Sequence, residues 1–258
     1  YTIFIREINT NKLITKEISD TSGSITFSLD DKYIFYSKLD KNHRARKIYR
    51  HEIGNFDGKD ELIFEEKSDA FTVSIGISSD EKYYFINTSD HNTSEQYYFN
   101  SNEKKPDPKL IIKREKGIIY NVSSWHGKFY NHTNKGAEDF KIDICDNLES
   151  QNWKTFLPGK DGVLIHGLTF LKNWIVRGET SNALDKLFVR NILTNIEEEL
   201  IFSDEIVYVP GVSLTQKDRD TDEVYLAYSS PKTPSRVYKY NLSSKSKKLV
   251  KEQEIPSG

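Results

Sequence analysis

The sequence has 258 residues, which is enough for one large all-β domain or for two ordinary domains. It carries 37 basic and 39 acidic residues and a net charge of −2, which argues against a nucleic-acid partner because a phosphate backbone selects a strongly basic surface. No run of about 18 apolar residues occurs, so no membrane-spanning helix is predicted. Residues 1–7 (YTIFIRE) lack a signal-peptide pattern and are typical of a strand, which favours a segment cut from a longer polypeptide.

The chain has a single cysteine, Cys145, within the strand-like segment 142–146. One thiol cannot form an internal disulfide, and a secreted all-β protein of this size would more often carry disulfides. We therefore expect a reducing compartment, the cytoplasm, and a thiol that is buried as a small apolar side chain.

The first predicted elements are two short strands, 2–7 and 12–18, joined by a turn at 9–11. A repeat begins after them: residues 28–36 (SLDDKYIFY) align with 78–86 (SSDEKYYFI) at an offset of 50 residues. In both segments a polar turn precedes an aromatic-rich strand. The same pattern returns at 126–130, 172–176 and 221–228.

Each repeat also predicts three further strands, one before the turn and two after it. The strands before the turn are 24–28, 71–77, 118–122, 163–170 and 206–212. The strands after the aromatic one are 47–53, 96–99, 140–144, 187–192 and 237–242, and the last strands are 61–64, 110–112, 153–156, 199–202 and 248–250. Four antiparallel strands in about 45–50 residues are typical of a propeller blade.

The sequence therefore predicts an all-β chain, a β-propeller of four-stranded antiparallel blades. Five units are expected, at 19–66, 67–115, 116–157, 158–202 and 203–251, with residues 1–18 as half of a preceding blade. Helical periodicity is absent. A β-sandwich is the rival fold, but it would not repeat turn and strand at this near-constant spacing.

Catalytic and cofactor motifs are absent from the sequence. There is no Gly-x-Ser-x-Gly elbow and no glycine-rich phosphate loop, so we expect no catalytic residue and no cofactor. The acidic clusters mostly precede the aromatic strand, where a turn favours Asp. The basic stretch 41–47 is expected to be a solvated loop, with a surface that faces a partner domain as the alternative. The three tryptophans are expected in the core.

No metal site is predicted either, because no histidine pairs with another or with the cysteine at a metal-ligand spacing. We expect the histidine side chains at the surface or in blade turns. The six histidines are His43, His51, His91, His126, His132 and His166.

Five short segments of the chain are similar to segments of one known protein family and occur in the same order. They are 48–54 (IYRHEIG), 60–74 (DELIFEEKSDAFTVS), 93–96 (TSEQ), 228–234 (YSSPKTP) and 252–256 (EQEIP). With them, the chain resembles the propeller of the prolyl oligopeptidase family of serine peptidases, in its oligopeptidase B branch. The resemblance implies a seven-bladed propeller that caps an α/β-hydrolase domain, of which this chain would hold about five and a half blades. It also implies that the Ser, Asp and His of the triad, and the acidic residues that select Arg or Lys, lie beyond residue 258.

By the same resemblance, the chain is expected to be the non-catalytic lid of an enzyme that cleaves short basic peptides, with its own hydrolase domain as partner and a channel that admits substrates by size. Innermost strands line such a channel. Alternation along 71–77 places the small side chains on one face, so Thr72, Ser74 and Gly76 are candidate channel-lining residues. The alternative is a stand-alone propeller that binds proteins. A propeller enzyme acting on sugars would need convergent carboxylates, which the sequence does not indicate.

Overall fold

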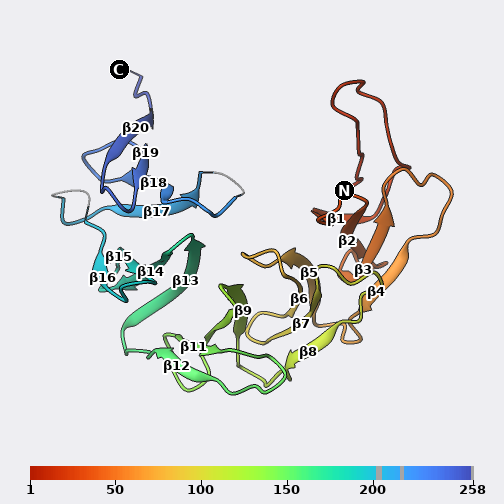
Figure 1. Ribbon diagram of the computed structural model, residues 1–258, viewed down its shortest axis with the longest axis horizontal. Helices are drawn as coiled ribbons and strands as arrows, with labels where there is room; N and C mark the ends of the chain where they lie inside the picture. The colour runs from red at the N-terminus through yellow and green to blue at the C-terminus, as the bar shows by residue number, and fades with distance from the viewer. Residues whose placement is uncertain (202–204, 216–217, 257–258) are drawn as a thin grey trace. The chain divides into compact units, whose positions relative to one another are not determined.

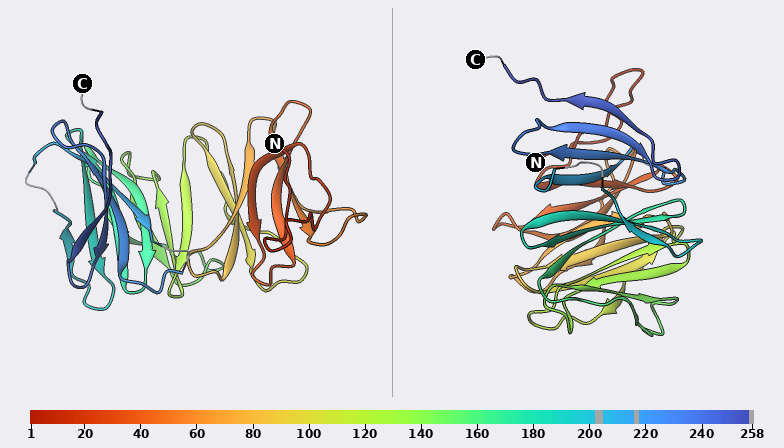
Figure 2. Two further views of the ribbon diagram at one scale, coloured as in Figure 1. Left: turned by 90° about the horizontal axis from the view of Figure 1, so that it is seen from above. Right: turned by 90° about the vertical axis from the view of Figure 1, so that its left-hand side faces the viewer.

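A computed structural model describes residues 1–201, 205–215 and 218–256. Within these ranges the chain forms twenty strands and no helix, and the strands make five four-stranded sheets (Figures 1 and 2). In every sheet the neighbours are consecutive in sequence, so each sheet is an antiparallel meander. This is the construction of a propeller blade, and it confirms the predicted β-propeller fold.

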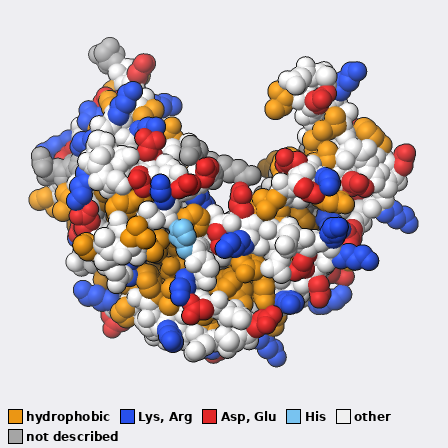
Figure 3. Space-filling view, viewed as in Figure 1, with side chains coloured by type: hydrophobic (Ala, Val, Ile, Leu, Met, Phe, Trp, Pro, Cys, Tyr) orange, Lys and Arg blue, Asp and Glu red, His pale blue; other side chains and the backbone are white. Residues whose placement is uncertain are grey.

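The chain divides into two compact units. The first unit comprises Tyr1–Lys135 and Asp143–Lys154, and the second comprises Gly136–Ile142 and Thr155–Gly258. The boundary expected between the fourth and fifth repeats, at residues 202 and 203, lies outside the described residues. On the face drawn in Figure 3, basic and acidic side chains are interspersed, which agrees with the near-neutral net charge.

Two complete sheets belong to the first unit, and a third begins there. The first sheet contains β1 (Thr21–Phe27), β2 (Tyr33–Leu39), β3 (Ala45–Glu52) and β4 (Glu61–Glu65). The second contains β5 (Thr72–Ile77), β6 (Tyr83–Ser89), β7 (Ser94–Asn100) and β8 (Lys109–Ile112). The third contains β9 (Tyr120–Trp125), β10 (Lys128–Thr133), β11 (Lys141–Cys145) and β12 (Lys154–Leu157).

The remaining two sheets belong to the second unit. The fourth sheet contains β13 (Val163–Leu171), β14 (Trp174–Ser181), β15 (Leu184–Asn191) and β16 (Glu197–Glu199). The fifth contains β17 (Val209–Leu214), β18 (Glu223–Ser229), β19 (Arg236–Asn241) and β20 (Lys247–Glu252). The exposed β20 is rich in lysine, which protects an open sheet edge from pairing with another chain.

The repeated polar turn has the same structure in the first two sheets. The hydroxyl of Ser28 donates to the carboxylate of Asp30 at 2.7 Å and accepts from the N–H of Tyr33 at 2.9 Å. Ser78 and Asp80 make the equivalent contacts in the second sheet. The residue after the aspartate has a positive φ in both turns, 55° and 56°. Serine and aspartate at this spacing therefore stabilise the turn locally, because their short polar side chains satisfy its backbone groups.

The first eighteen residues differ from their prediction. The sequence predicts two continuous strands, but the structure has a hairpin with two isolated antiparallel bridges, Ile3 to Ile18 and Arg6 to Leu13. The register shifts between these bridges, which interrupts the ladder. Apolar side chains still fix the hairpin, because Ile3 and Ile18 are buried in a cluster with Tyr36 of β2.

Aromatic side chains fill the core between the first two sheets. The ring centroids of Phe35 and Tyr84 lie 4.8 Å apart, and those of Tyr84 and Phe99 lie 5.1 Å apart. All three rings are buried and come from β2, β6 and β7. In the second unit the core is mainly aliphatic, with Val176 and Leu226 in one cluster from two sheets.

Side chains of β7 hold the backbone of β9, the first strand of the next sheet. Ser94 donates to the carbonyl of Tyr120 at 2.8 Å and accepts from its N–H at 2.7 Å. Gln96 accepts from the N–H of Val122 at 2.5 Å. The phenol of Tyr120 accepts from the N–H of Gln96 and donates to the carbonyl of Ile112. β9 pairs with β10 on one edge only, so these contacts satisfy its other edge.

We expect Gln96→Leu to lower the free energy of unfolding by about 2 kcal/mol, because the buried N–H of Val122 loses its acceptor. Urea denaturation followed by tryptophan fluorescence measures the change. Gln253→Leu is the matched control at an exposed position, where we expect a change within about 0.5 kcal/mol. An equal loss in the two variants would contradict the role of the Gln96 amide.

Candidate functional site

The three candidate channel-lining residues lie on β5, the first strand of the second sheet. Thr72 and Gly76 are half-buried and Ser74 is exposed, whereas Val73 and Ile75 between them pack into the core. Alternation therefore does place the small side chains together on the face opposite the hydrophobic cluster that Val73 and Ile75 join. A Cβ built on Gly76 would meet no atom within 4 Å, so this face is open beside the strand.

The backbone of β5 is held by the first sheet, as β9 is held by the second. Thr26 of β1 donates to the carbonyl of Ile75 at 3.1 Å. Ser37 of β2, a buried side chain, donates to the carbonyl of Val73, also at 3.1 Å. β5 is thus fixed on both edges, by β6 on one side and by hydroxyls on the other, so its open face has a defined position.

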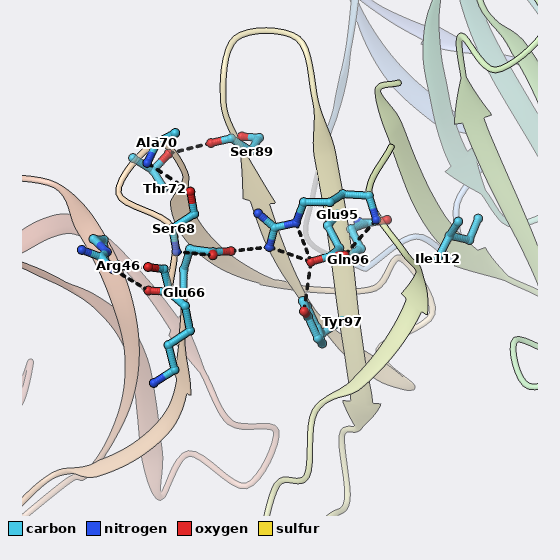
Figure 4. A network of polar contacts seen from close by, with 12 residues as sticks. Arg46, Glu66, Ser68, Ala70, Thr72, Ser89, Glu95, Gln96, Tyr97 and Ile112 are labelled. Carbon is cyan, nitrogen blue, oxygen red and sulfur yellow. Dashed lines mark hydrogen bonds and ion pairs between the residues drawn. The ribbon is translucent and has the colours of Figure 1, made fainter. Parts of the chain in front are cut away.

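A network of charged side chains lies where the first two sheets connect to their successors (Figure 4). Arg114, just after β8, donates to Glu66 at 2.6 Å and to Glu95 at 2.7 Å. The guanidinium also lies 4.0 Å from the ring centroid of Phe71. The two glutamate side chains are only 4% and 5% exposed. One arginine is therefore shared by two buried carboxylates, one just after β4 and one on β7.

A second arginine extends this network. Arg46 of β3 donates to the carbonyls of Glu66 and Lys67, both at 3.0 Å, and to the carboxylate of Asp69. Residues 41–43 form an exposed turn as expected, but the second half of the stretch 41–47 is not a solvated loop. β3 begins at Ala45, so Arg46 belongs to a strand. Its guanidinium binds the backbone carbonyls that follow β4. The connection between the first two sheets is thereby fixed next to the start of β5.

Opposing effects set the pKa of Glu95. Burial raises the pKa of its carboxyl group, but hydrogen bonds from Arg114 and from the phenol of Tyr97 outweigh burial and hold the pKa below its usual value. Glu95 also accepts from the backbone N–H of Arg114 at 2.8 Å. The folded chain therefore favours the ionised carboxylate.

His51 forms a second buried polar cluster, which corrects the expectation that the histidines lie at the surface or in turns. Its Nδ1 lies 2.8 Å from Asp60, and its Nε2 contacts the hydroxyl of Thr15. The phenol of Tyr36 donates to the same Asp60 at 2.6 Å. Thr, His and Asp are residue types of hydrolytic sites, but Thr15 and His51 are each only 1% exposed. A substrate has no access to this hydroxyl, and the cluster attaches the first eighteen residues to the first sheet.

The structure also shows where the cysteine and the three tryptophans lie. Cys145 is buried in a hydrophobic cluster as expected, and burial raises the pKa of its thiol to about 11. Trp125 is buried, and Trp153 and Trp174 pack against hydrophobic clusters. In the part of the chain that the structure describes, no three His, Cys, Asp or Glu residues are arranged to hold a metal ion. Nor does any helix there reach the length and hydropathy needed to cross a bilayer.

The sequence did not assign the roles of Glu66, Glu95 and Arg114. Two of the three lie inside the strings that carry the family resemblance, Glu66 in 60–74 and Glu95 in 93–96. Gln96 lies in the second of these strings. The available signal was therefore the resemblance itself, which marked the right segments without indicating their contacts.

The family profile described as "Prolyl oligopeptidase, N-terminal beta-propeller domain" matches residues 1–253. The chain belongs to this family. This confirms the resemblance found in the sequence. Among curated relatives, Protease 2 of Moraxella lacunata is 29% identical over 97% of the chain and 36% of its own length. Dipeptidyl aminopeptidase BI of Pseudoxanthomonas mexicana is 26% identical over 99% of the chain and 35% of its own length. The chain thus spans about a third of these relatives.

Solved structures agree with this assignment. Oligopeptidase B from Trypanosoma brucei, in a closed form with covalently bound antipain, matches 93% of the chain with a TM-score of 0.86 and 25% identity. The chain covers 35% of that protein. Oligopeptidase B from Leishmania major matches 98% of the chain with a TM-score of 0.90, and at 20% identity it supports the fold alone. The chain covers 37% of that structure.

We expect Arg114→Met to lower the free energy of unfolding by about 3 kcal/mol, because two buried carboxylates lose their counter-ion while the aliphatic stem is kept. Arg236→Met removes an exposed pair with Glu252 and should cost within about 1 kcal/mol. Urea denaturation of both variants gives the comparison. Similar losses would show that the Arg114 network adds nothing beyond a surface ion pair.

The lowered pKa of Glu95 predicts an acid-sensitive contribution to stability. Because the unfolded chain protonates near the ordinary value of 4.5 and the folded chain below it, this contribution is fully present above pH 4.5. It decreases as the pH falls below 4.5 and is lost as the pH falls through the lower pKa of the folded chain. Glu95→Gln should therefore reduce the drop in the free energy of unfolding between about pH 6.5 and about pH 4. Glu254→Gln, at an exposed position, should leave the drop unchanged. An unchanged drop in Glu95→Gln would overturn this assignment.

Proposed function

We propose that this chain is the non-catalytic propeller lid of a serine oligopeptidase that cleaves short peptides after Arg or Lys. The match of residues 1–253 to the N-terminal propeller of the family is the observation that carries the proposal. Relatives named Protease 2 and oligopeptidase B support the peptidase class. The sequence contains no nucleophile elbow, so the proposal assigns the chemistry to an α/β-hydrolase domain and no catalytic role to this chain.

Selection by size is the second part of the proposal. Thr72, Ser74 and Gly76 would line the path of the substrate, because they share the open face of β5. Thr26 and Ser37 fix the backbone of that strand, so the opening would have a nearly constant width. A narrow opening with small side chains admits an extended peptide and excludes a folded protein. Opening and closure of the lid would then gate turnover.

The cellular setting is proposed from the cysteine. Cys145 is the only cysteine in the sequence, and it is buried with a raised pKa. A protein that builds no disulfide is suited to a reducing compartment such as the cytoplasm. Short basic peptides would be the substrates of the full-length enzyme.

The first test is an assay of the intact gene product and of this chain on a short fluorogenic peptide with Arg before the cleaved bond. We expect hydrolysis by the intact protein, its inhibition by a serine-directed reagent, and no hydrolysis by the chain alone. In the intact protein, Ser74→Trp should reduce kcat/KM about tenfold or more for peptides of about ten residues, and much less for the short substrate.

Ser150→Trp, at an exposed position between β11 and β12, is the matched control and should leave both values unchanged. Absence of activity in the intact protein would reject the peptidase assignment and favour a propeller that binds proteins. Activity with no length-dependent effect of Ser74→Trp would keep the peptidase and reject β5 as the lining of the substrate path.

A further inference from the structure

A row of three polar side chains crosses the second sheet from its open edge into its interior. Ser74 on β5, Asn87 on β6 and Gln96 on β7 are paired in register, so their side chains share one face of the sheet. Ser74 is exposed, Asn87 is half-buried and Gln96 is only 2% exposed. Neither the family assignment nor the proposed lid function gives Asn87 a role.

The backbone of Val122 fixes the orientation of the Gln96 amide. Its N–H donates to Oε1 of Gln96 at 2.5 Å, so the atom at this position is the oxygen and the other terminal atom is the nitrogen. The nitrogen donates to the carbonyl of Val122 at 3.5 Å and to Oδ1 of Asn87 at 2.5 Å. Gln96 therefore presents a donor to Asn87.

This donor fixes the amide of Asn87 in turn. Only the amide oxygen can accept from Gln96, so Oδ1 of Asn87 faces β7 and Nδ2 lies on the opposite side of the group. Nδ2 has no hydrogen-bond partner among residues 1–201, 205–215 and 218–256. It also keeps surface that is accessible to solvent. The half-buried Asn87 thus offers N–H donors in a defined orientation.

The surroundings of this donor are open and uncharged. A Cβ built on Gly76 would meet no atom within 4 Å, and the hydroxyl of Ser74 is exposed. A ligand there meets neutral donors beside small side chains, which suits a neutral acceptor better than an ion. The neighbouring rows on this face contain no charged residue; they are Thr72, Ser89 and Ser94 on one side and Gly76, Phe85 and Tyr98 on the other.

The backbone of β5 is less available to a ligand than this side chain. Two carbonyls on its edge without a partner strand already accept hydrogen bonds from the hydroxyls of Thr26 and Ser37. A peptide that added to this edge as a further strand would have to displace both hydroxyls. The amide of Asn87 can donate without any such displacement.

We propose that Nδ2 of Asn87 donates a hydrogen bond to a backbone carbonyl of the peptide that passes along the open face of β5. The inference rests on the proposed function, because it requires β5 to line the path of the substrate. Every residue of a peptide has a backbone carbonyl, so this contact adds affinity without selecting a sequence. The small side chains would limit the width of the peptide while Asn87 holds its backbone.

An NMR titration of the isotope-labelled full chain tests this contact without any catalytic step. The probe is a peptide of about ten alternating Ala and Ser residues, acetylated and amidated so that it carries no charge. The side-chain N–H signals of Asn87, identified by their loss in Asn87→Asp, should shift when the peptide is added. Signals that do not move would leave Asn87 hydrogen-bonded to water alone and would overturn the proposal.

The variant Asn87→Asp keeps the oxygen to which Gln96 donates and replaces the outward N–H donor by a second oxygen. The affinity for the neutral peptide should fall about fivefold, the effect of losing one neutral hydrogen bond. Asn102→Asp, at an exposed site after β7, adds the same charge and should leave the affinity within about 1.5-fold. Circular dichroism confirms that both variants are folded. Equal affinities of the two variants and the original chain would refute the contact.

Kinetics of the intact protein separate this inference from the proposed function. Asn87→Asp should raise KM about fivefold for a peptide of about ten residues with a single Arg, and much less for the short fluorogenic substrate. Salt at about 0.5 M screens the attraction between the Arg and the new carboxylate. If the intact protein hydrolyses no peptide, the proposed function fails and the titration of the chain still decides the role of Asn87. If it hydrolyses both substrates and Asn87→Asp leaves KM unchanged, the peptidase assignment stands and this inference fails.

Discussion

The first unit depends on how β5 and β9, the first strands of their sheets, are satisfied at the edge that has no partner strand. β5 and β9 each pair with one strand only, so a row of backbone groups faces the neighbouring sheet. Buried backbone groups without partners are costly, each at about 1–3 kcal/mol. Hydroxyl and amide side chains from the preceding sheet supply the missing bonds, as Ser37 does for β5 and Gln96 for β9. The same contacts satisfy the backbone and set the spacing of successive sheets.

At the connection between sheets, buried charges affect specificity more than they affect stability. Taking Glu66 and Glu95 out of water is unfavourable, and their shared partner Arg114 offsets the penalty only while its geometry is maintained. A pair of leucines would fill the same space without a penalty, but leucines would not specify which loop meets which strand. Four hydrogen bonds from Arg114, three from its guanidinium and one from its backbone N–H, do specify it. The network therefore contributes more to the uniqueness of the connection than to net stability.

The fold was predictable because its signals are local. The turn that starts at Ser28 recurs at Ser78 with the same side-chain contacts, so repeat length, strand number and blade architecture could be recognised from the pattern alone. The Glu66–Arg114 contact joins residues 48 positions apart, and no periodic pattern marks such a pair. His51 illustrates the same limit, because its burial depends on Thr15 and Asp60 from separate segments. The two strands expected in the first eighteen residues fail for a related reason: alternation predicts extended chain but does not fix the register between two segments.

The strings that carry the family resemblance contain residues with different roles in the structure. The string 93–96 includes Ser94, Glu95 and Gln96, which all hold neighbouring segments, so similarity there reports how blades are joined. The face proposed to meet the substrate is Thr72, Ser74 and Gly76, where small size matters more than chemical identity. A lid that selects by width needs a rigid backbone and small side chains, and many combinations of small residues meet that need. Similarity at 93–96 therefore reports the contacts that hold β9, whereas the contacts that hold β5, from Thr26 and Ser37, lie outside the resembling strings. Thr72 and Ser74 lie in the string 60–74, so the resemblance reaches the proposed substrate face without indicating that small size is what matters there.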